Sequence, residues 1–231
     1  MDNFFKKNPT VNEYHERADV DCNRYASTLS VIFTIYLLIT LTVSIINSTS
    51  DTILINGVKH ELAWFSLCFN IIFGGMFTYS FAEISRKVHY REELVTLDLF
   101  YGLKKFLRAF CLNLLGCIKV FLWTLLFVVP GIMKSYAYVM SVYISNENPD
   151  LSANECLKRS EKMMDGLKWE YFSLMFRYIG WILLSVLTFG ILFVWVLPKM
   201  KQTSYLFYLK ISGKGEQDNL IKPTDVVREE Y

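Results

Sequence analysis

Residues 26–47 read ASTLSVIFTIYLLITLTVSIIN, an uninterrupted stretch of 22 residues without a charged side chain. A hydrocarbon core about 30 Å thick takes roughly 20 helical residues to cross, so this stretch is long enough to span it. Three more apolar stretches follow at residues 62–82, 109–133 and 178–198, and among them only 109–133 holds a charge, Lys119. Four such stretches predict an integral membrane protein built from α-helices.

The composition excludes several other classes of protein. The 231 residues include 53% hydrophobic and only 20% charged side chains, whereas soluble domains carry roughly 25% charge. The formal net charge of +2 is too small for a protein that neutralises many nucleic-acid phosphates. We therefore expect one all-α, polytopic transmembrane bundle over residues 26–211, cytoplasmic tails at 1–25 and 212–231, and no nucleic-acid partner.

The basic residues predict the orientation, because Lys and Arg stay on the cytoplasmic side near the ends of spans. Four of them precede the first apolar stretch, only Lys59 lies in the loop 51–61, and six lie in the loop 83–108. This alternation predicts a cytoplasmic N-terminus and an external first loop.

The second half of the chain allows two topologies. With four spans, the loop 134–177 is external and carries six basic residues, which breaks the orientation rule. With six spans, Val129-Pro130-Gly131 forms an outer turn before a short fourth helix at 132–145. Thr188-Phe189-Gly190 forms a second turn before a sixth helix at 191–211, since Pro and Gly interrupt helices. Six spans are favoured and four are the alternative, and both leave the two termini in the cytoplasm.

A short internal similarity bears on this choice. Trp123 and Trp181 each open the pattern W-x-L-L-x-V, and a break that ends in Gly131-Ile or Gly190-Ile follows. One hairpin design used twice explains the pattern, and so does chance similarity between Leu-rich segments. The six-span topology also carries a cost, because Lys199 and Lys201 then lie inside the sixth helix, where charge is expensive.

Residues 152–166 carry the clearest local pattern outside the apolar stretches. Ser152 and Glu155 have the spacing of a capping box, in which each side chain accepts a hydrogen bond from the other residue's backbone. An apolar stripe follows on one face, opposite a charged face: Cys156, Leu157, Met163, Met164 and Leu167. The pattern predicts a cytoplasmic amphipathic helix that ends at Gly166. It either packs against its own bundle or lies on anionic lipid or on a partner.

Small and weakly polar residues recur at every fourth position of the second apolar stretch: Ser66, Asn70, Gly74, Thr78 and Ala82. Such a stripe lets helices approach closely in lipid. We therefore expect a packing seam, with a functional groove as the alternative interpretation. The expected hairpin and packing residues are Pro130, Gly131, Gly190 and Gly74.

Ionisable residues inside a membrane segment are candidate functional sites. Lys119 lies near the middle of 109–133, at the same expected depth as Asn70, and Arg177 lies near the cytoplasmic end of the fifth helix. Together with Lys199 and Lys201 they form a candidate intramembrane polar site. If the three lysines face one cavity, that cavity suits an anionic ligand such as a phosphate head group. The interiors of the predicted spans lack Asp and Glu, which argues against a proton relay.

Signatures of catalysis and of metal binding are absent from the sequence. The three histidines are scattered, and the five cysteines lack the C-x-x-C spacing typical of redox and zinc sites. We expect no enzymatic activity, no cofactor and no metal site.

The second half of the chain resembles a known family through a series of residues: Trp123, Leu125, Leu126, Pro130-Gly131-Ile132, Lys134, Tyr138, Glu147-Asn148-Pro149, Ser152-Ala153, Ser160, Met163-Met164, Gly166, Lys168, Gly180-Trp181, Gly190, Pro198 and Phe207-Tyr208. This series is similar to the bacterial integral membrane family called domain of unknown function 975, found mainly in Gram-positive bacteria. The similarity covers about residues 100–212, and the family commonly has Tyr where this chain has Lys199. The resemblance implies several membrane helices and a location in the cell membrane, and it implies no activity.

These observations predict a non-enzymatic membrane protein that acts by binding other membrane components, as an accessory, assembly or immunity-type protein. The lipid bilayer and a second membrane protein are the expected partners. The alternative is a small permease or transporter component for an anionic or lipid-like ligand, which the embedded cations and the helix breaks would suit.

Overall fold

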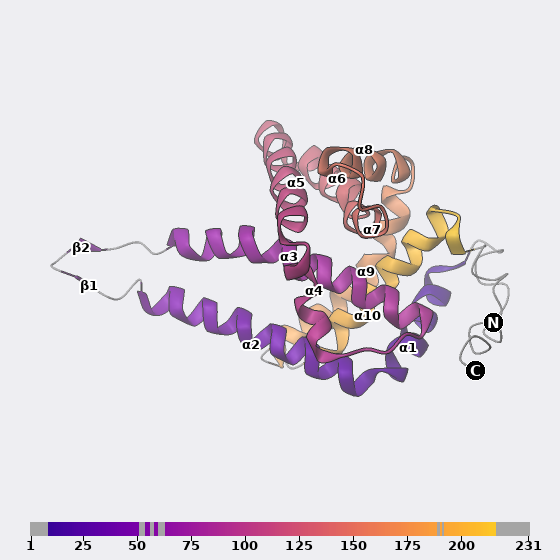
Figure 1. The fold of residues 1–231 in the computed structure, drawn as a ribbon, viewed down its shortest axis with the longest axis horizontal. Helices are drawn as coiled ribbons and strands as arrows, with labels where there is room; N and C mark the ends of the chain where they lie inside the picture. Colours follow the sequence, from indigo (N-terminus) through magenta and orange to yellow (C-terminus); the bar gives the residue numbers. More distant parts are fainter. Residues whose placement is uncertain are drawn as a thin grey trace.

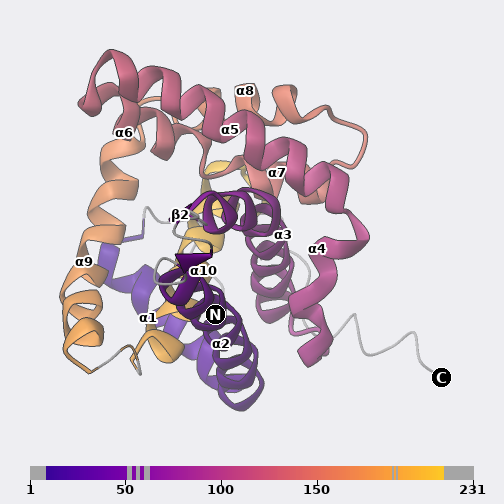
Figure 2. The same cartoon turned by 90° about the vertical axis from the view of Figure 1, so that its left-hand side faces the viewer.

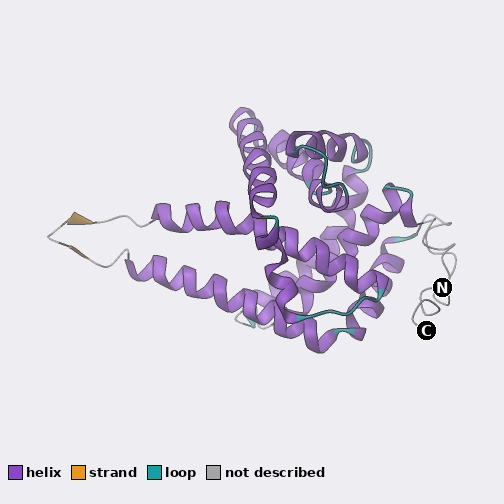
Figure 3. Ribbon diagram, in the orientation of Figure 1, coloured by secondary structure: helices purple, strands orange, loops and turns teal. Residues whose placement is uncertain are grey.

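The computed structural model describes residues 9–50, 54–55, 58–59, 63–188, 190 and 192–215, and within these ranges it describes the side chains of residues 9–45 and of those from 72 onward. The described chain is helical apart from one small β pair (Figures 1 and 3). The helices are α1 (Val11–Arg24), α2 (Ala26–Ser50), α3 (Ala63–Tyr90), the 3-10 helix η1 (Thr96–Phe100), α4 (Tyr101–Lys104), α5 (Phe106–Leu126), α6 (Val128–Tyr138), α7 (Ser141–Glu147), α8 (Ala153–Met163), α9 (Lys168–Leu187) and α10 (Phe193–Ile211). Strands β1 (Leu54–Ile55) and β2 (Val58–Lys59) pair antiparallel between α2 and α3.

The long helices are arranged as three hairpins that point in different directions. Helices α2 and α3 lie side by side along the longest axis of the molecule, and the β pair lies at their far end (Figure 1). The α5–α6 and α9–α10 hairpins pack at the other end, and both α5 and α9 run across the direction of α2 and α3 (Figures 1 and 2). The three hairpins therefore do not form a bundle of parallel helices.

Aromatic side chains fill the core where the hairpins meet. Phe33 of α2 stacks on Phe81 of α3 with ring centroids 4.8 Å apart. Tyr143 of α7 and Tyr208 of α10 stack at 5.3 Å in a second cluster. Buried hydroxyls need partners, and Tyr79 of α3 donates to the backbone oxygen of Ser145 in α7 at 3.0 Å. These contacts attach α3 to α7, and α7 in turn to α10.

Two of the predicted continuous spans are broken in the structure. The stretch 109–133 is interrupted at Phe127, whose extended backbone (φ −155°, ψ 141°) separates α5 from α6. The stretch 178–198 is interrupted by a turn at Gly190, whose φ of +86° favours glycine. Single helices over 109–133 and 178–198, as the four-span topology requires, are therefore wrong, and the predicted turn at Gly190 is confirmed.

The predicted turn at Val129-Pro130-Gly131 is wrong in position, because the chain turns at Phe127 and these residues lie in the first turns of α6. Pro130 is tolerated there because backbone N–H groups in the first turn of a helix have no partner within it. Gly131 is instead a packing residue. A Cβ atom at this position would lie 2.1 Å from Thr124 Oγ1, so the absence of a side chain lets α6 approach α5.

The position of closest helix packing on α3 lies one residue away from the predicted one. A Cβ atom at Gly74 would meet nothing within 4 Å, whereas one at Gly75 would lie 2.7 Å from the backbone oxygen of Ala109 in α5. Gly75 rather than Gly74 is therefore the close-approach position. The side chain of Asn70 lies outside the part of the chain whose side chains the structure describes.

The predicted N-terminal tail contains a helix. Thr10 and Glu13 form a capping box at the start of α1, and α1 packs on α10 with Tyr14, Ala18 and Cys22 buried. These three residues recur every fourth position, which is the pattern of a helix face. Burial raises the pKa of the Cys22 thiol to about 12, so this thiol stays protonated near neutral pH.

The predicted amphipathic helix is observed as α8. The capping box of Ser152 and Glu155 is present, and Gly166 has a φ of +75° shortly after the helix ends. Cys156 and Leu157 are buried against neighbouring helices, and Ser160 Oγ donates to the backbone oxygen of Ala137 in α6 at 2.7 Å. Helix α8 thus packs against its own bundle and exposes its charged face.

Within the described residues, three helical segments are long and apolar enough to cross a membrane: Ala26–Ile45 of α2, Phe106–Leu126 (α5) and Lys168–Leu187 (α9). The described part of the chain is therefore helical apart from the β pair, and its long apolar helices suggest a membrane protein.

Candidate functional site

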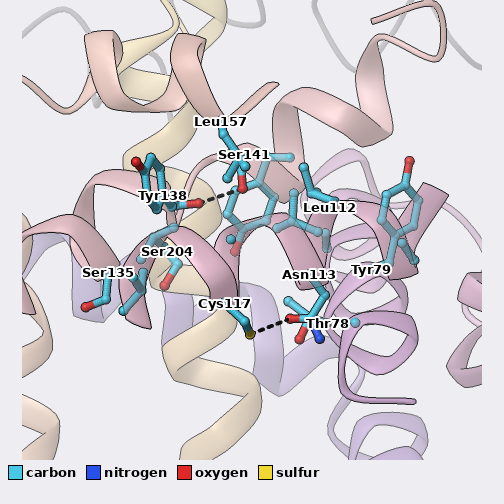
Figure 4. A pocket seen from close by; sticks show the side chains of 18 of the residues that line it. Thr78, Tyr79, Leu112, Asn113, Cys117, Ser135, Tyr138, Ser141, Leu157 and Ser204 are labelled. Carbon is cyan, nitrogen blue, oxygen red and sulfur yellow. Dashed lines mark hydrogen bonds between the residues drawn. The ribbon is translucent and has the colours of Figure 1, made fainter. Parts of the chain in front are cut away.

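A large cavity lies where α3, α5, α6, α7 and α10 meet (Figure 4). Its volume is about 700 Å³. Its wall is mostly apolar, with Ala82, Leu112, Val142 and Leu157 among the lining residues. Several lining residues are exposed and form the mouth: Thr78, Cys117, Phe121, Thr124 and Ser135. The volume lies in the range of pockets that hold small molecules.

Small residues and aromatic hydroxyls shape the cavity. Gly75 brings α3 against α5 on one side, and Gly116 removes a side chain from the wall, since a Cβ atom there would come no closer than 3.8 Å to Leu157. On the far side, Tyr171 of α9 hydrogen-bonds Ser204 of α10 at 3.0 Å. The stripe of small residues on α3 thus faces the cavity at Thr78 and Ala82, which is the groove that the sequence left as the alternative interpretation.

Most hydroxyls in the wall already have partners. Thr78 donates to the backbone oxygen of Gly74 at 2.8 Å, and Ser141 donates to that of Tyr138 at 2.6 Å (Figure 4). Lys201 is the cationic group of the wall. Its Nζ atom lies 5.9 Å from the centroid of the Phe81 ring, and among the described residues no carboxylate forms an ion pair with it. A largely apolar wall with one cation suits an amphipathic ligand whose polar end is neutral or anionic.

The three predicted lysines do not line one cavity. Lys119 Nζ donates to Asn154 Oδ1 of α8 at 2.7 Å, and Lys199 Nζ lies 2.9 Å from Asp19 Oδ1 of α1. Only Lys201 lines the large cavity. The hypothesis of a single cavity for Lys119, Lys199 and Lys201 is therefore wrong, because the polar helices α8 and α1 pair with two of the lysines.

A second, smaller cavity brings together two of the predicted site residues, Arg177 and Lys199. Arg177 of α9 and Lys199 of α10 both line a space of about 180 Å³, together with His15 and Asp19 of α1. Burial, assisted by the nearby Arg177 guanidinium, holds the pKa of His15 below its ordinary range. Sequence reasoning missed His15 and Asp19, although the capping box at Thr10 and Glu13 was a detectable sign of a helix there.

Within the ranges that the structure describes, no group of three or more His, Cys, Asp or Glu side chains is placed to hold a metal ion. The described residues provide two cavities that are lined by apolar and cationic side chains.

Comparison with known proteins yields one family. The model of the family described as "Protein of unknown function (DUF975)" matches residues 125–215, which run from the end of α5 through α10. No curated protein and no solved structure matches the chain. The resemblance noted in the second half of the sequence is thus confirmed over residues 125–215, which hold α6 to α10 and the last residues of α5.

Proposed function

We propose that this protein is a non-enzymatic component of the cell membrane that binds a lipid-like molecule in the large cavity. The observation that carries the proposal is the cavity of about 700 Å³ whose wall is mostly apolar and holds one lysine that forms no ion pair with a carboxylate of the described residues. Apolar walls suit an acyl chain, and Lys201 suits an anionic or carbonyl oxygen at its polar end. Binding of this kind fits an accessory, assembly or protective role beside a second membrane protein.

The proposed membrane orientation rests on where apolar and charged side chains are exposed. Apolar side chains are exposed along α5 and α9, and toward the C-terminal end of each helix they are exposed on more than one face: Leu107, Ile118, Leu122 and Leu125 on the first, and Trp169, Phe176, Leu183 and Leu187 on the second, among others. Helices α1 and α8 expose charged residues instead. Charged helices are costly in hydrocarbon, and Lys and Arg favour the cytoplasmic side near the ends of spans, so we place α1, α8 and both termini on that side.

The number of crossings follows from the directions of the hairpins. At about 1.5 Å per residue, α2 and α3 are each longer than the roughly 30 Å hydrocarbon core. Helices α5 and α9 run across α2 and α3 (Figures 1 and 2). If α2 and α3 cross the bilayer, α5 and α9 therefore lie roughly parallel to the membrane plane. We therefore propose that α2 and α3 cross the membrane and that the two shorter hairpins embed in the cytoplasmic leaflet. The six-span topology is the alternative.

The position of Lys119 supports this arrangement. Its partner Asn154 belongs to the charged helix α8, so Lys119 lies at the membrane surface. From Lys119 to the end of α5 at Leu126 the helix extends only about 10 Å, about a third of the hydrocarbon core. If Lys119 lies at the membrane surface, the rest of α5 is too short for the α5–α6 turn to reach the opposite surface.

A test of binding can use a native cysteine. Cys117 lines the large cavity and is exposed, and Cys111 on the same helix is exposed without lining it. In nanodiscs, a long-chain fatty acid at about ten times its dissociation constant should slow maleimide labelling of Cys117 about tenfold, and should leave Cys111 unchanged. Peptide mass spectrometry reports both cysteines from one sample.

Gly116→Leu provides the matched variant, because it adds a side chain inside the cavity at a position where a Cβ atom makes only ordinary contact. Protection of Cys117 should disappear in this variant while the protein still folds. Equal slowing at Cys117 and Cys111, or protection that persists in Gly116→Leu, would contradict binding in this cavity. Flux of the bound molecule through liposomes that hold this chain alone would favour the permease alternative.

A further inference from the structure

The smaller cavity between α1, α9 and α10 has the composition of a site for an anionic head group. It is separate from the large cavity and holds about 180 Å³. Two cations, Arg177 and Lys199, line it together with Asp19. Lys199 Nζ lies 2.9 Å from Asp19 Oδ1, and Arg177 donates to Asn12 Oδ1. With both cations and one carboxylate counted, the formal charge of the cavity is positive by one.

His15 supplies a second and independent observation. Its side chain is only 6% exposed and lines the cavity, and its Nε2 atom has no hydrogen-bond partner among the described residues. The other ring nitrogen is engaged by the backbone of Leu174. Buried polar atoms are nearly always paired in folded proteins. A neutral imidazole in this state accepts a hydrogen bond at Nε2, and a ligand that carries a hydrogen-bond donor, such as a hydroxyl, would supply the missing partner.

The surroundings place this cavity at the level of lipid head groups. The charged helix α1 forms one wall and excludes a position inside the hydrocarbon core. Trp181 and Trp195 line the cavity and are 53% and 51% exposed. Tryptophan is enriched at membrane–water interfaces because its ring is partly apolar and partly polar. The two rings therefore offer apolar contact next to the cations.

We propose that this cavity binds the head group of an anionic phospholipid that carries a hydroxyl, as in phosphatidylglycerol. The phosphate lies between Arg177 and Lys199, and the head-group hydroxyl donates to His15 Nε2. Trp181 and Trp195 contact the adjoining glycerol and the start of the acyl chains. The volume equals that of about six water molecules at ~30 Å³ each, which accommodates a phosphate with a three-carbon alcohol.

The test compares lipids by native mass spectrometry and thermal shift on the purified full chain in detergent. Phosphatidylglycerol should bind the native protein about tenfold more tightly than phosphatidylcholine, since both lipids carry the phosphate but the choline cation of phosphatidylcholine is repelled by Arg177 and Lys199. Arg177→Gln should reduce this preference to about threefold or less. The combined variant Asp19→Asn with Lys199→Gln should do the same while it keeps a polar pair between α1 and α10.

Arg159→Gln is the matched control, because it removes one exposed cation from α8, a helix that contributes no residue to this cavity. Its lipid preference should equal that of the native protein. Equal loss in Arg159→Gln and Arg177→Gln would overturn the proposal, because the effect would then reflect overall charge. Melting temperatures without lipid identify any variant that fails to fold.

Two further arms address the chemistry of the ligand. Phosphatidylmethanol is anionic and its head group lacks a hydrogen-bond donor, so it should bind more weakly than phosphatidylglycerol, and His15→Phe should abolish that difference. Glycerol 3-phosphate should compete poorly; if it binds as tightly as the lipid, the ligand is a soluble phosphate ester and the lipid assignment is overturned. Neither arm involves Cys117, so failure here is distinguishable from failure of the large cavity to bind.

Discussion

At the scale of single residues, the glycines of this protein have different roles according to what lies beside them. A Cβ atom at Gly131 would lie 2.1 Å from Thr124 Oγ1 and 2.8 Å from Thr124 Cα, whereas one at Gly180 would meet nothing within 4 Å. Thr124 Cα belongs to the backbone of α5 and cannot rotate away. Gly131 is therefore required by packing, and Gly180 is not.

Gly131→Ala should destabilise the α5–α6 hairpin, because the new methyl group overpacks the contact with Thr124. Overpacking of this kind costs about 1–3 kcal/mol, so the melting temperature in detergent should fall measurably. Gly180→Ala is the control, and it should leave the melting temperature unchanged or raise it, since Ala favours helix by about 1 kcal/mol. Equal melting temperatures for the two variants would contradict the packing role of Gly131.

At the scale of elements, the two polar helices α1 and α8 organise the apolar ones. Each begins with a capping box, and each buries an apolar stripe while its polar residues pair with lysines of the longer helices. Asp19 of α1 pairs with Lys199, and Glu161 of α8 pairs with Lys134. Charges that are costly inside a membrane helix are thereby satisfied at its surface.

The docking of α1 should depend on pH through His15. Burial and the Arg177 guanidinium lower the pKa of His15 in the folded protein, although Asp19 acts in the opposite direction. The unfolded chain, with an ordinary pKa of about 6.5, then binds the proton more readily. The stabilisation that neutral His15 contributes is therefore complete above about pH 6.5. It is lost as the pH falls through that value toward the lower pKa of the folded state.

Melting temperatures measured between about pH 7.5 and pH 5.5, a range that brackets the ordinary histidine pKa, should fall with acidification in the native protein. His15→Gln removes the titrating group, so its melting temperature should vary less over the same range. A variant that retains the full pH dependence would show that other groups are responsible.

At the scale of the whole molecule, the proposed membrane arrangement rests on the directions of the hairpins. Length and composition qualify α2, α5 and α9 as candidate spans, yet α5 and α9 run across α2 (Figures 1 and 2). Helices that lie at large angles to one another cannot all cross a bilayer along its normal. In the proposed arrangement, α5 and α9 lie along the membrane plane instead of crossing it.

Cysteine labelling distinguishes the topologies. Val128, at the turn between α5 and α6, is 63% exposed, so impermeant maleimide on intact cells should miss Val128→Cys if the hairpin stays in the cytoplasmic leaflet. External labelling at this position would support six spans. Thr52→Cys, in the predicted external loop, is the positive control.

Arg159→Cys on the exposed face of α8 should be labelled only after the cells are permeabilised, since α8 is proposed to be cytoplasmic. An introduced cysteine is needed because the native Cys156 and Cys22 are both buried and would resist labelling on either side. Labelling of Arg159→Cys on intact cells would place α8 outside and contradict the proposed orientation.

The sequence by itself determined the membrane character, the helical class, the turn at Gly190 and the capped helix that begins after Ser152. These features depend on local composition and spacing, so the length of an apolar stretch and the spacing of a capping box are enough to predict them. The family resemblance was equally readable, because it rests on residues in series.

Only the tertiary structure decided which residues share a cavity and how the hairpins are directed. Lys119, Lys199 and Lys201 looked alike as embedded cations, and their separation depends on packing by α1 and α8, which lie far from some of them in the chain. The turn at Phe127 was misplaced because Pro130 is compatible with either a turn or the first turn of a helix. Angles between helices arise from contacts between distant side chains, and no local pattern in the sequence encodes them.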